Sequence, residues 1–260
     1  MKLHSISAAA VALLVLWTAP AFAGVSSKET DRFERSGQVL QDMIDAPDNG
    51  IPKGMLDHAR CLAVVPSLKK GAFGFGGRFG YGFVTCRRNM KGAWGPVSSF
   101  KIAGGNAGFH IGSESVDVVL LFVHPRGTQK LLADQFSLGG DTSVSAGPLG
   151  DKASSETSAL HSEIYSYALS RGAFTDIALD GARMYQDSEV NRDLYGRQIK
   201  AADILVNPKV AVPDGAAHMI GVLNRYSPRA KEVSPPQSTS GVRKPRNVNT
   251  RPRAAGSTKP

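Results

Sequence analysis

One segment decides the fold: Gly71-Ala-Phe-Gly-Phe-Gly-Gly-Arg-Phe-Gly-Tyr-Gly-Phe-Val-Thr-Cys86. Glycine and aromatic residues alternate through it, and alternation with a period of two residues is typical of β-strands. Glycine weakens a strand, so this many glycines indicate bulges, bends or the close approach of another backbone. The segment therefore predicts a kinked, strongly coiled β-hairpin.

The chain around this hairpin predicts a single domain of the α+β class. Apolar positions from Phe33 to Ile44 form one stripe of an amphipathic helix near the N-terminus. The other expected elements are short helices over 51–59, 128–136, 191–195 and 198–204, strands over 61–65, 73–77, 81–87, 97–103, 107–111, 117–123 and 144–146, and a hairpin over 163–170 and 174–180. Together they predict a coiled antiparallel β-sheet or partial barrel with short helices packed on it.

Further short motifs flank the hairpin in a definite order. They are Val64-Val65-Pro66-Ser67-Leu68-Lys69-Lys70, Trp94-Gly95-Pro96-Val97, Gly104-Gly105-Asn106-Ala107-Gly108-Phe109-His110-Ile111-Gly112, Asp117-Val118-Val119-Leu120-Leu121-Phe122, Ser145-Ala146-Gly147-Pro148, Ile164-Tyr165-Ser166-Tyr167, Ser170-Arg171-Gly172-Ala173-Phe174, and Asn191 with Tyr195-Gly196. As an ordered set they resemble the lipid-binding SYLF domain, over roughly Arg32 to Leu205. The chain is identified as an exported, bacterial-type member of that family, which also includes yeast regulators of actin.

The resemblance implies a non-enzymatic module that binds anionic, phosphoinositide-type lipids through its N-terminal helix and a basic surface. The matching lipid-binding candidates are Arg32, Phe33, Arg35, Leu40, Lys69, Lys70 and Arg78. The helix region carries five acidic residues against three basic ones, whereas helices that lie on membranes prefer Lys and Arg. The alternative is a helix that packs its apolar stripe on its own sheet.

Residues 1–23 have the pattern of a secretory signal peptide. Lys2 is followed by an apolar run from Ile6 to Trp17 and by the cleavage motif Ala21-Phe22-Ala23. The run is too short to span a bilayer in the usual way. We therefore expect a protein that is periplasmic or secreted, with a peripheral position on an envelope membrane as one option; an uncleaved N-terminal anchor is the alternative.

The rest of the chain divides by composition into a SYLF-like domain over 24–207, a connector over 208–232 and a disordered basic tail over 233–260. The basic residues of the tail are Arg243, Lys244, Arg246, Arg251, Arg253 and Lys259. They supply six of the chain's nine net positive charges, and residues 3–232 carry only about +2. Such a tail suits anionic lipids or other acidic envelope polymers, and a purely solubilising tail is the alternative.

Two cysteines, Cys61 and Cys86, remain in a chain that we expect to be exported. An even number of cysteines in an oxidising compartment favours a disulfide. Cys61 opens one expected strand and Cys86 closes another, so the two meet if these strands are neighbours. Two buried thiols are the alternative.

The sequence shows no catalytic motif, so we predict a non-enzyme without a cofactor or a metal. None of the six histidines forms H-x-x-x-H or H-E-x-x-H, and the glycine-rich run lacks both phosphate-binding fingerprints. Ser67-Leu68-Lys69-Lys70 fits S-x-x-K, but the chain has no S-D-N or K-T-G partner.

Three functions remain open. An anionic lipid or membrane surface is the first expected partner, and an envelope protein bound by a scaffold module is the second. The third is a small ligand carried near the turns Gly104-Gly105-Asn106 and Gly139-Gly140-Asp141. Neither nucleic acid nor actin is expected as a partner of an exported protein, and the oligomeric state is left open.

Overall fold

The computed structural model describes residues 26–47, 50–73, 75–106, 112–150, 161–175 and 177–229. Three predicted segments lie outside the described residues. They are the signal peptide over 1–23, the strand over 107–111, and the tail with Arg243, Lys244, Arg246, Arg251, Arg253 and Lys259.

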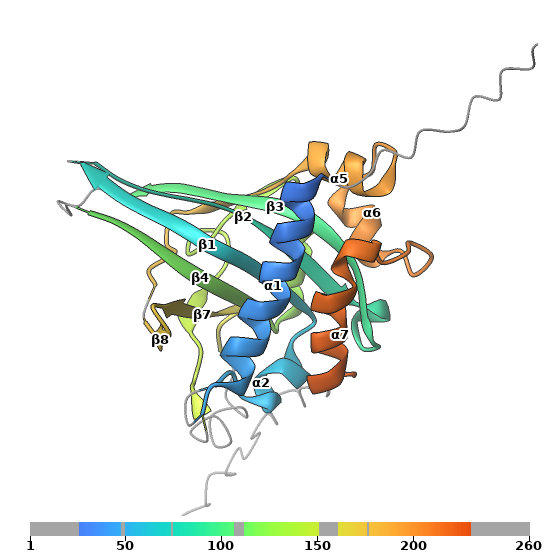
Figure 1. Ribbon diagram of the computed structural model, residues 1–260, viewed down its shortest axis with the longest axis horizontal. Coiled ribbons are helices and arrows are strands. Elements are labelled where there is room, and N and C mark those ends of the chain that lie inside the picture. Colours follow the sequence, from blue (N-terminus) through green and yellow to red (C-terminus); the bar gives the residue numbers. More distant parts are fainter. Residues whose placement is uncertain are drawn as a thin grey trace, which may run out of the picture.

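The nine described strands form one sheet that curls into a half-barrel (Figure 1). They are β1 (Cys61–Phe73), β2 (Phe75–Arg87), β3 (Trp94–Asn106), β4 (Gly112–Phe122), β5 (Gln135–Ser137), β6 (Val144–Ala146), β7 (Ile164–Ser170), β8 (Ala173–Phe174) and β9 (Arg183–Gln186). Their order is β5-β9-β3-β2-β1-β4-β7-β6, with β8 also paired to β7. All strand pairs are antiparallel except β6 with β7, which is parallel. The predicted α+β class with a partial barrel is confirmed, and the sheet is mixed rather than purely antiparallel.

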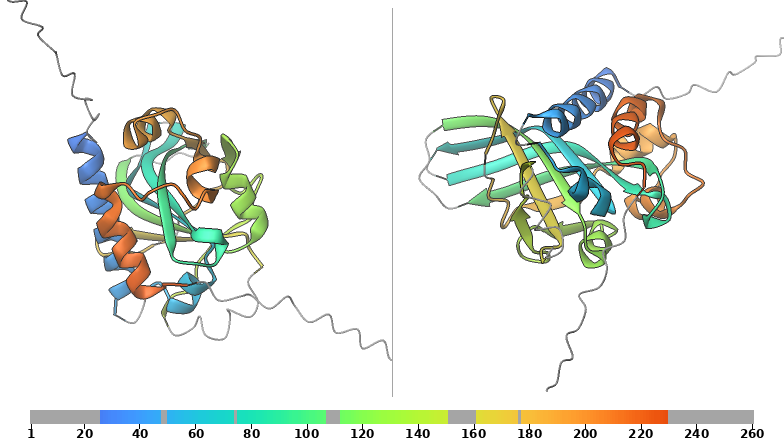
Figure 2. Two further views of the ribbon diagram at one scale, coloured as in Figure 1. Left: turned by 90° about the vertical axis from the view of Figure 1, so that its right-hand side faces the viewer. Right: turned by 90° about the horizontal axis from the view of Figure 1, so that it is seen from below.

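Helices α1 and α7 cover one face of this sheet, and α3 lies on its opposite side (Figures 1 and 2). The described helices are α1 (Ser27–Asp45), α2 (Lys53–His58), α3 (Pro125–Leu131), α5 (Ser188–Tyr195), α6 (Ala201–Val206) and α7 (Ala217–Tyr226), with short 3-10 turns η1 (Arg88–Met90) and η4 (Asp214–Ala216). Helix α1 begins where the side chain of Ser26 accepts a hydrogen bond from the backbone N–H of Glu29. Helices α1 and α7 pack closely, and the imidazole of His218 in α7 lies directly against Gly37 of α1.

The sheet separates two apolar cores. In β1, Leu62 and Val64 belong to the core under α1, α2 and α7, together with Phe33 and Leu40 of α1. Their neighbours Cys61, Ala63 and Val65 belong to a second core inside the half-barrel. Successive side chains of a strand point to opposite faces, so the central strands are buried on both sides.

The coil of the β1–β2 hairpin requires glycine at defined places. A Cβ at Gly82 would lie 2.1 Å from the carbonyl oxygen of Val64, and one at Gly80 would lie 2.8 Å from Cδ1 of Leu68. The two strands therefore approach more closely here than any side chain allows. A Cβ at Gly71, near the tip of the hairpin, would meet nothing within 4 Å.

Four sequence predictions are wrong in detail. The expected helix over 128–136 is α3, which begins earlier at Pro125, and Phe136 lies instead in β5, opposite Met184 of β9. The strand β9 itself was not predicted, and the second arm of the 163–180 hairpin shortens to β8. The segment over 208–232 is not merely a connector, because Met219, Val222 and Leu223 of α7 are buried against α1. The folded domain therefore extends beyond residue 207 to at least Ser227.

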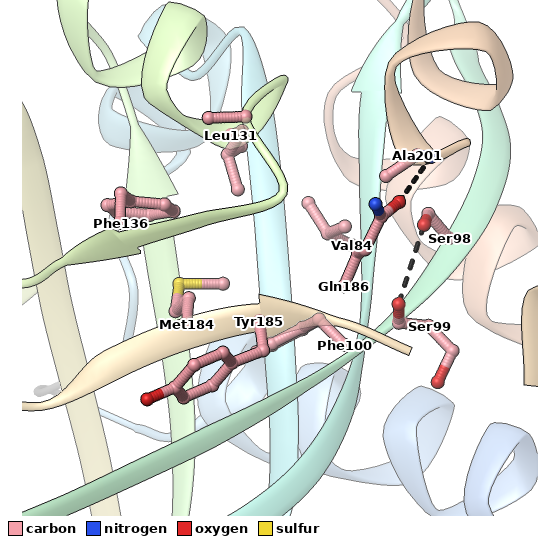
Figure 3. A pocket seen from close by; sticks show the side chains of 11 residues that line it. Val84, Ser98, Ser99, Phe100, Leu131, Phe136, Met184, Tyr185, Gln186 and Ala201 are labelled. Carbon is pink, nitrogen blue, oxygen red and sulfur yellow. Dashed lines mark hydrogen bonds between the residues drawn. The ribbon is translucent and has the colours of Figure 1, made fainter. Parts of the chain in front are cut away.

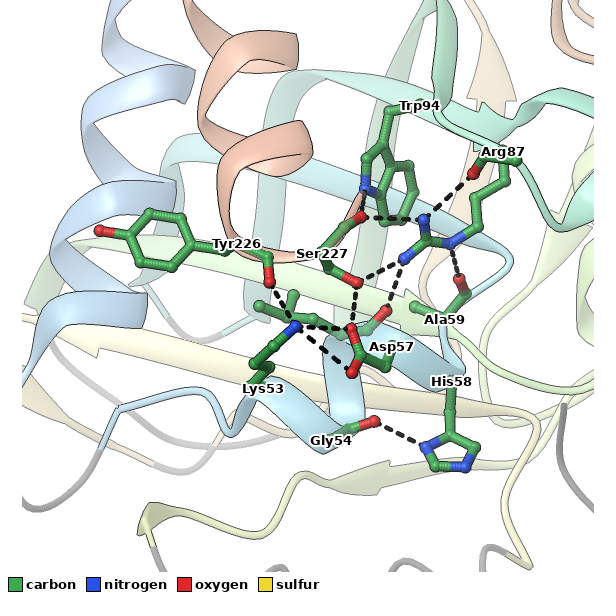
Figure 4. Close-up of polar contacts among 11 residues, drawn as sticks. Lys53, Gly54, Asp57, His58, Ala59, Arg87, Trp94, Tyr226 and Ser227 are labelled. Atoms are coloured by element: carbon green, nitrogen blue, oxygen red, sulfur yellow. Dashed lines mark hydrogen bonds and ion pairs between the residues drawn. The ribbon is translucent and has the colours of Figure 1, made fainter. Parts of the chain in front are cut away.

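A buried arginine attaches the end of this domain to the sheet (Figure 4). Arg87 has no exposed surface, and its Nη1 and Nη2 donate to the carbonyl oxygen and the hydroxyl of Ser227 at 2.9 and 2.6 Å. Its Nε donates to the carbonyl oxygen of Ala59 at 2.8 Å, and the guanidinium lies 4.2 Å from the ring centroid of Trp94. Burial lowers the pKa of Arg87 to about 10, while the nearby charge of Asp57 acts in the opposite direction. The side chain is therefore charged at neutral pH.

We expect opposite effects from alanine at two glycines of the hairpin. Gly82→Ala should lower the free energy of unfolding by about 2 kcal/mol or more, because its methyl group would overlap the backbone of β1. Gly71→Ala should be neutral or stabilise by up to about 1 kcal/mol, since alanine is less flexible in the unfolded chain. Urea unfolding of both variants checks this, and equal destabilisation would contradict the packing of β1 on β2.

Arg87→Lys should destabilise the domain by about 3 kcal/mol, because an ammonium group cannot replace the planar set of donors that Arg87 uses. The matched control is Arg126→Lys, whose side chain is 79% exposed in its ion pair with Glu163. Thermal unfolding should separate the two variants clearly. A small effect at Arg87 would mean that the C-terminal attachment contributes little.

Candidate functional site

The distal halves of β1 to β4 project beyond the helices (Figures 1 and 2). On the helix side of this projection, four residues lie in one row across the sheet. Lys69 of β1 pairs with Phe79 of β2, Phe79 pairs with Ala103 of β3, and Ala103 pairs with Arg183 of β9. Residues paired in this way share a face and their side chains are neighbours. Phe79 is 42% exposed, with Lys69 next to it on one side and Arg183 beyond Ala103 on the other.

A second row, closer to α1, supports Phe79 from behind. The rings of Phe79 and Tyr81 meet edge to face, with centroids 4.9 Å apart. Three cations lie over the ring of Tyr81: the guanidinium of Arg32 at 4.8 Å, and Nζ of Lys28 and Lys101 at 5.7 and 6.0 Å. Each contact combines a positive charge with the negative face of the aromatic ring.

The row in front of Phe79 has glycine at three neighbouring positions, and Ser113 of β4 pairs with the first of them. Gly71 of β1, Gly77 of β2 and Gly105 of β3 are paired in register. A Cβ at Gly77 or Gly105 would be 3.9 or 3.6 Å from its nearest neighbour, an ordinary contact distance, so glycine is not required there by packing. Gly71, Gly77 and Gly105 therefore place no side chain beside Phe79 on its tip side.

The charge of this region is only partly balanced. Arg32 pairs with Glu29, and Lys101 lies 3.7 Å from Asp187. Nζ of Lys69 donates to the hydroxyl of Ser115 at 3.1 Å.

Within the described ranges, no carboxylate lies within ion-pair distance of Lys28, Lys69 or Arg183. We call Lys28, Lys69, Phe79, Tyr81, Lys101 and Arg183 the Phe79 surface. It combines an exposed aromatic ring with a net positive charge.

Most of the lipid-binding candidates from the sequence lie elsewhere. Phe33 and Leu40 have no exposed surface, and the ring of Phe33 stacks on Phe83 with centroids 3.7 Å apart. Direct lipid contact by these two residues was therefore a wrong prediction, and α1 packs its apolar stripe on its own sheet. Arg78 is also buried, and it donates to the carbonyl oxygen of Ala178. Desolvation lowers the pKa of Arg78, and Asp180 acts against this shift.

The four remaining candidates differ in their partners. Arg35 is held by Asp117 at 2.8 Å, Arg32 lies on Tyr81, and Lys70 is 3.7 Å from Glu114. Lys69 is the candidate that the structure places within the Phe79 surface.

Sequence reasoning missed the centre of the Phe79 surface. The period-two alternation of Phe79, Tyr81 and Phe83 was a usable signal, because it places the three rings on one face. Arg183 could not be placed without β9, which carries it next to Ala103.

Cys61 and Cys86 form a disulfide between paired positions of β1 and β2, with sulfur atoms 1.99 Å apart. Both cysteines are fully buried in the interior core. The bond closes the hairpin at the end opposite to its projecting tip.

A small, partly open cavity lies between β3, β9 and α3 (Figure 3). Its volume is about 20 Å³, room for one water molecule. Two polar groups of its lining are already bonded: Oε1 of Gln186 accepts from the N–H of Ala201, and the hydroxyl of Ser98 accepts from Asn191. This cavity therefore gives no support to the carrier hypothesis.

A larger, open groove of about 350 Å³ lies along β7, bordered by Tyr167 and Phe174. Among the described residues, neither an acidic nor a basic side chain lines it. Burial raises the pKa of Tyr167, whose hydroxyl donates to the carbonyl oxygen of Pro148 at 3.3 Å. The described lining of the groove therefore supplies no pair of groups suited to acid–base chemistry.

Among the described residues, no three or more His, Cys, Asp or Glu side chains cluster so that they could hold a metal. The described helices are also too short or too polar to cross a bilayer.

The fold and the site define a small α+β half-barrel domain whose distinctive feature is the Phe79 surface on its projecting strands. Residues 103–226 match the family model described as "Ysc84: Las17-binding protein actin regulator". The chain carries a domain of this Ysc84, or SYLF, family, as the ordered sequence motifs indicated.

Three relatives illustrate the similarity. "Protein YSC84" of Saccharomyces cerevisiae is 32% identical over 189 residues, which is 71% of this chain and 40% of the relative. "SH3 domain-containing YSC84-like protein 1" is 31% identical in Rattus norvegicus over 201 residues, 75% of this chain and 58% of the relative. The protein of the same name in Xenopus laevis is 33% identical over 186 residues, which is 70% of this chain and 55% of the relative. The match thus spans about half the length of these relatives.

Loss of the disulfide should destabilise the domain by about 3 kcal/mol, the value expected for a loop of 25 residues. Urea unfolding of the oxidised protein with and without reductant should show this difference. The double variant Cys61→Ala, Cys86→Ala serves as the control and should not respond to reductant. Two titratable thiols in the protein prepared under oxidising conditions would contradict the bond.

Proposed function

We propose that this protein is a non-enzymatic module that binds anionic lipid surfaces through the Phe79 surface. The observation that carries the proposal is the 42% exposed ring of Phe79 on a projecting sheet, beside Lys69 and in the same row as Arg183. Aromatic rings are favourable at the boundary between lipid head groups and acyl chains. Each nearby cation adds about 1 kcal/mol of attraction to an anionic membrane.

The lipid contact then lies on the projecting sheet and not on α1, where the sequence had predicted it. The first turns of α1 still contribute Lys28, which lies over Tyr81. The basic tail would add a second, nonspecific attraction at longer range. With the proposed signal peptide removed, the protein would act as a peripheral component of an envelope membrane.

The family description favours a second candidate function. Related proteins are named for binding Las17 and regulating actin, so the Phe79 surface could instead bind a protein. For this chain, such a scaffold role would involve an envelope protein, because proposed export separates it from actin. We propose no catalytic role.

Binding to vesicles distinguishes these functions. The test compares vesicles of phosphatidylcholine with vesicles that also contain phosphatidylglycerol. Phe79→Ser should weaken binding to the anionic vesicles about fivefold, because the variant loses about 1 kcal/mol of apolar insertion. The matched control is Val206→Ser, since Val206 is 45% exposed on α6 but lies away from the projecting tip.

Charge and tail are tested in the same assay. Lys69→Gln with Arg183→Gln should weaken binding by about tenfold or more at low salt and by less at physiological salt. A chain that ends at Glu232 should still bind and should still respond to Phe79→Ser. Binding that depends on the tail alone, or that ignores Phe79, would overturn the proposed site.

A further inference from the structure

Strand β1 contains a β-bulge two residues before Lys69. The register of β1 with β4 shifts between Val65 and Leu68, and its register with β2 shifts between Val64 and Lys69. Ser67 lies within the bulge and has φ of 57°, in the left-handed region that non-glycine residues rarely adopt. A bulge inserts an additional residue and therefore changes which face the following side chains occupy.

The change of face is visible in the cores. Ala63 and Val65 lie in the interior core, and an unbroken strand would continue this pattern at odd-numbered residues. Instead, Leu68 occupies the interior core and Lys69 lies on the opposite, helix-facing side. Without the bulge, Lys69 would point into the half-barrel and Leu68 would point out, because a slip of one residue inverts every side chain.

One carboxylate holds this bulge. Oδ1 of Asp117 in β4 accepts a hydrogen bond from the backbone N–H of Ser67 at 2.8 Å. Oδ2 of the same side chain accepts from Nη2 of Arg35 in α1, also at 2.8 Å. The Asp117 side chain is only 13% exposed. It therefore joins three elements, β4, β1 and α1, at the base of the projecting tip.

We propose that Asp117 is a positioning residue for the Phe79 surface. Its carboxylate stabilises the left-handed conformation of Ser67, and the bulge in turn sets Lys69 beside Phe79. The assignment rests on the proposed lipid-binding function, but the arrangement of the strand can be measured without lipid.

Asp117→Ala gives opposite predictions for two roles of this residue. Removal of an acidic group makes the surface more positive, so a purely electrostatic role predicts tighter binding to phosphatidylglycerol vesicles. The positioning role predicts binding about fivefold weaker than that of the unmodified protein, the effect of losing one cation from the surface. Asp117→Asn keeps an oxygen acceptor for Ser67 and should retain binding.

A rescue separates positioning from general stability. Glycine adopts positive φ without strain, so Ser67→Gly should hold the bulge without help from Asp117. The double variant Ser67→Gly, Asp117→Ala should therefore recover the binding that Asp117→Ala loses. Weak binding in the double variant would overturn the proposal, as would tighter binding of Asp117→Ala itself.

The rate of thiol labelling shows directly which face of the sheet residues 68 and 69 occupy. Lys69→Cys should react with a water-soluble maleimide much faster than Leu68→Cys, with the native disulfide kept oxidised. Introducing Asp117→Ala should reduce this contrast at least fivefold, and adding Ser67→Gly should restore it. An unchanged contrast would overturn the positioning role even if Phe79→Ser abolishes binding. Conversely, a lost contrast together with vesicle binding that ignores Phe79 would support the bulge mechanism and reject the proposed function.

Discussion

The structure depends on the burial of both faces of its central strands. In β1 and β4, alternate residues enter the core beneath α1 and α7 or the core inside the half-barrel, so neither face is available to solvent along most of their length. This arrangement dictates apolar residues at nearly every position, such as Val118 to Phe122 in β4. It also explains why a candidate binding surface can form only where the strands extend past their covering helices.

Three aromatic residues of β2, Phe79, Tyr81 and Phe83, show this limit along a single face. Phe83 is fully buried under Phe33, Tyr81 is half-buried beneath cations, and Phe79 is substantially exposed. The three rings occupy equivalent positions of one strand and differ in what lies above them. The same aromatic pattern therefore serves the core at one end and a surface at the other.

Much of the fold could be predicted from the sequence, because its signals are local. Alternation and apolar β-branched or aromatic content indicated strands within β1 to β4, although the prediction divided β1 and β2 into three strands over 61–65, 73–77 and 81–87; the spacing of Phe33, Leu40 and Ile44 identified α1. The α1 stripe did not reveal what covers it, since an apolar stripe looks the same whether it meets lipid or protein. The stripe packs on β2, where Phe33 stacks on Phe83, and on α7, more than 170 residues later in the chain. Arg183 was equally inaccessible, because a four-residue strand such as β9 is defined by its pairing and has little pattern of its own.

The packing of α1 on α7 also affects the protein while it is being made. Asp45, at the end of α1, hydrogen-bonds with Tyr226, at the end of α7, across 181 positions of sequence. Until the ribosome has synthesised α7, the apolar stripe of α1 lacks part of its final cover. Closing so long a loop also costs conformational entropy before the contact forms. The contact that joins the ends of α1 and α7 can therefore form only late in synthesis, after α7 has been made.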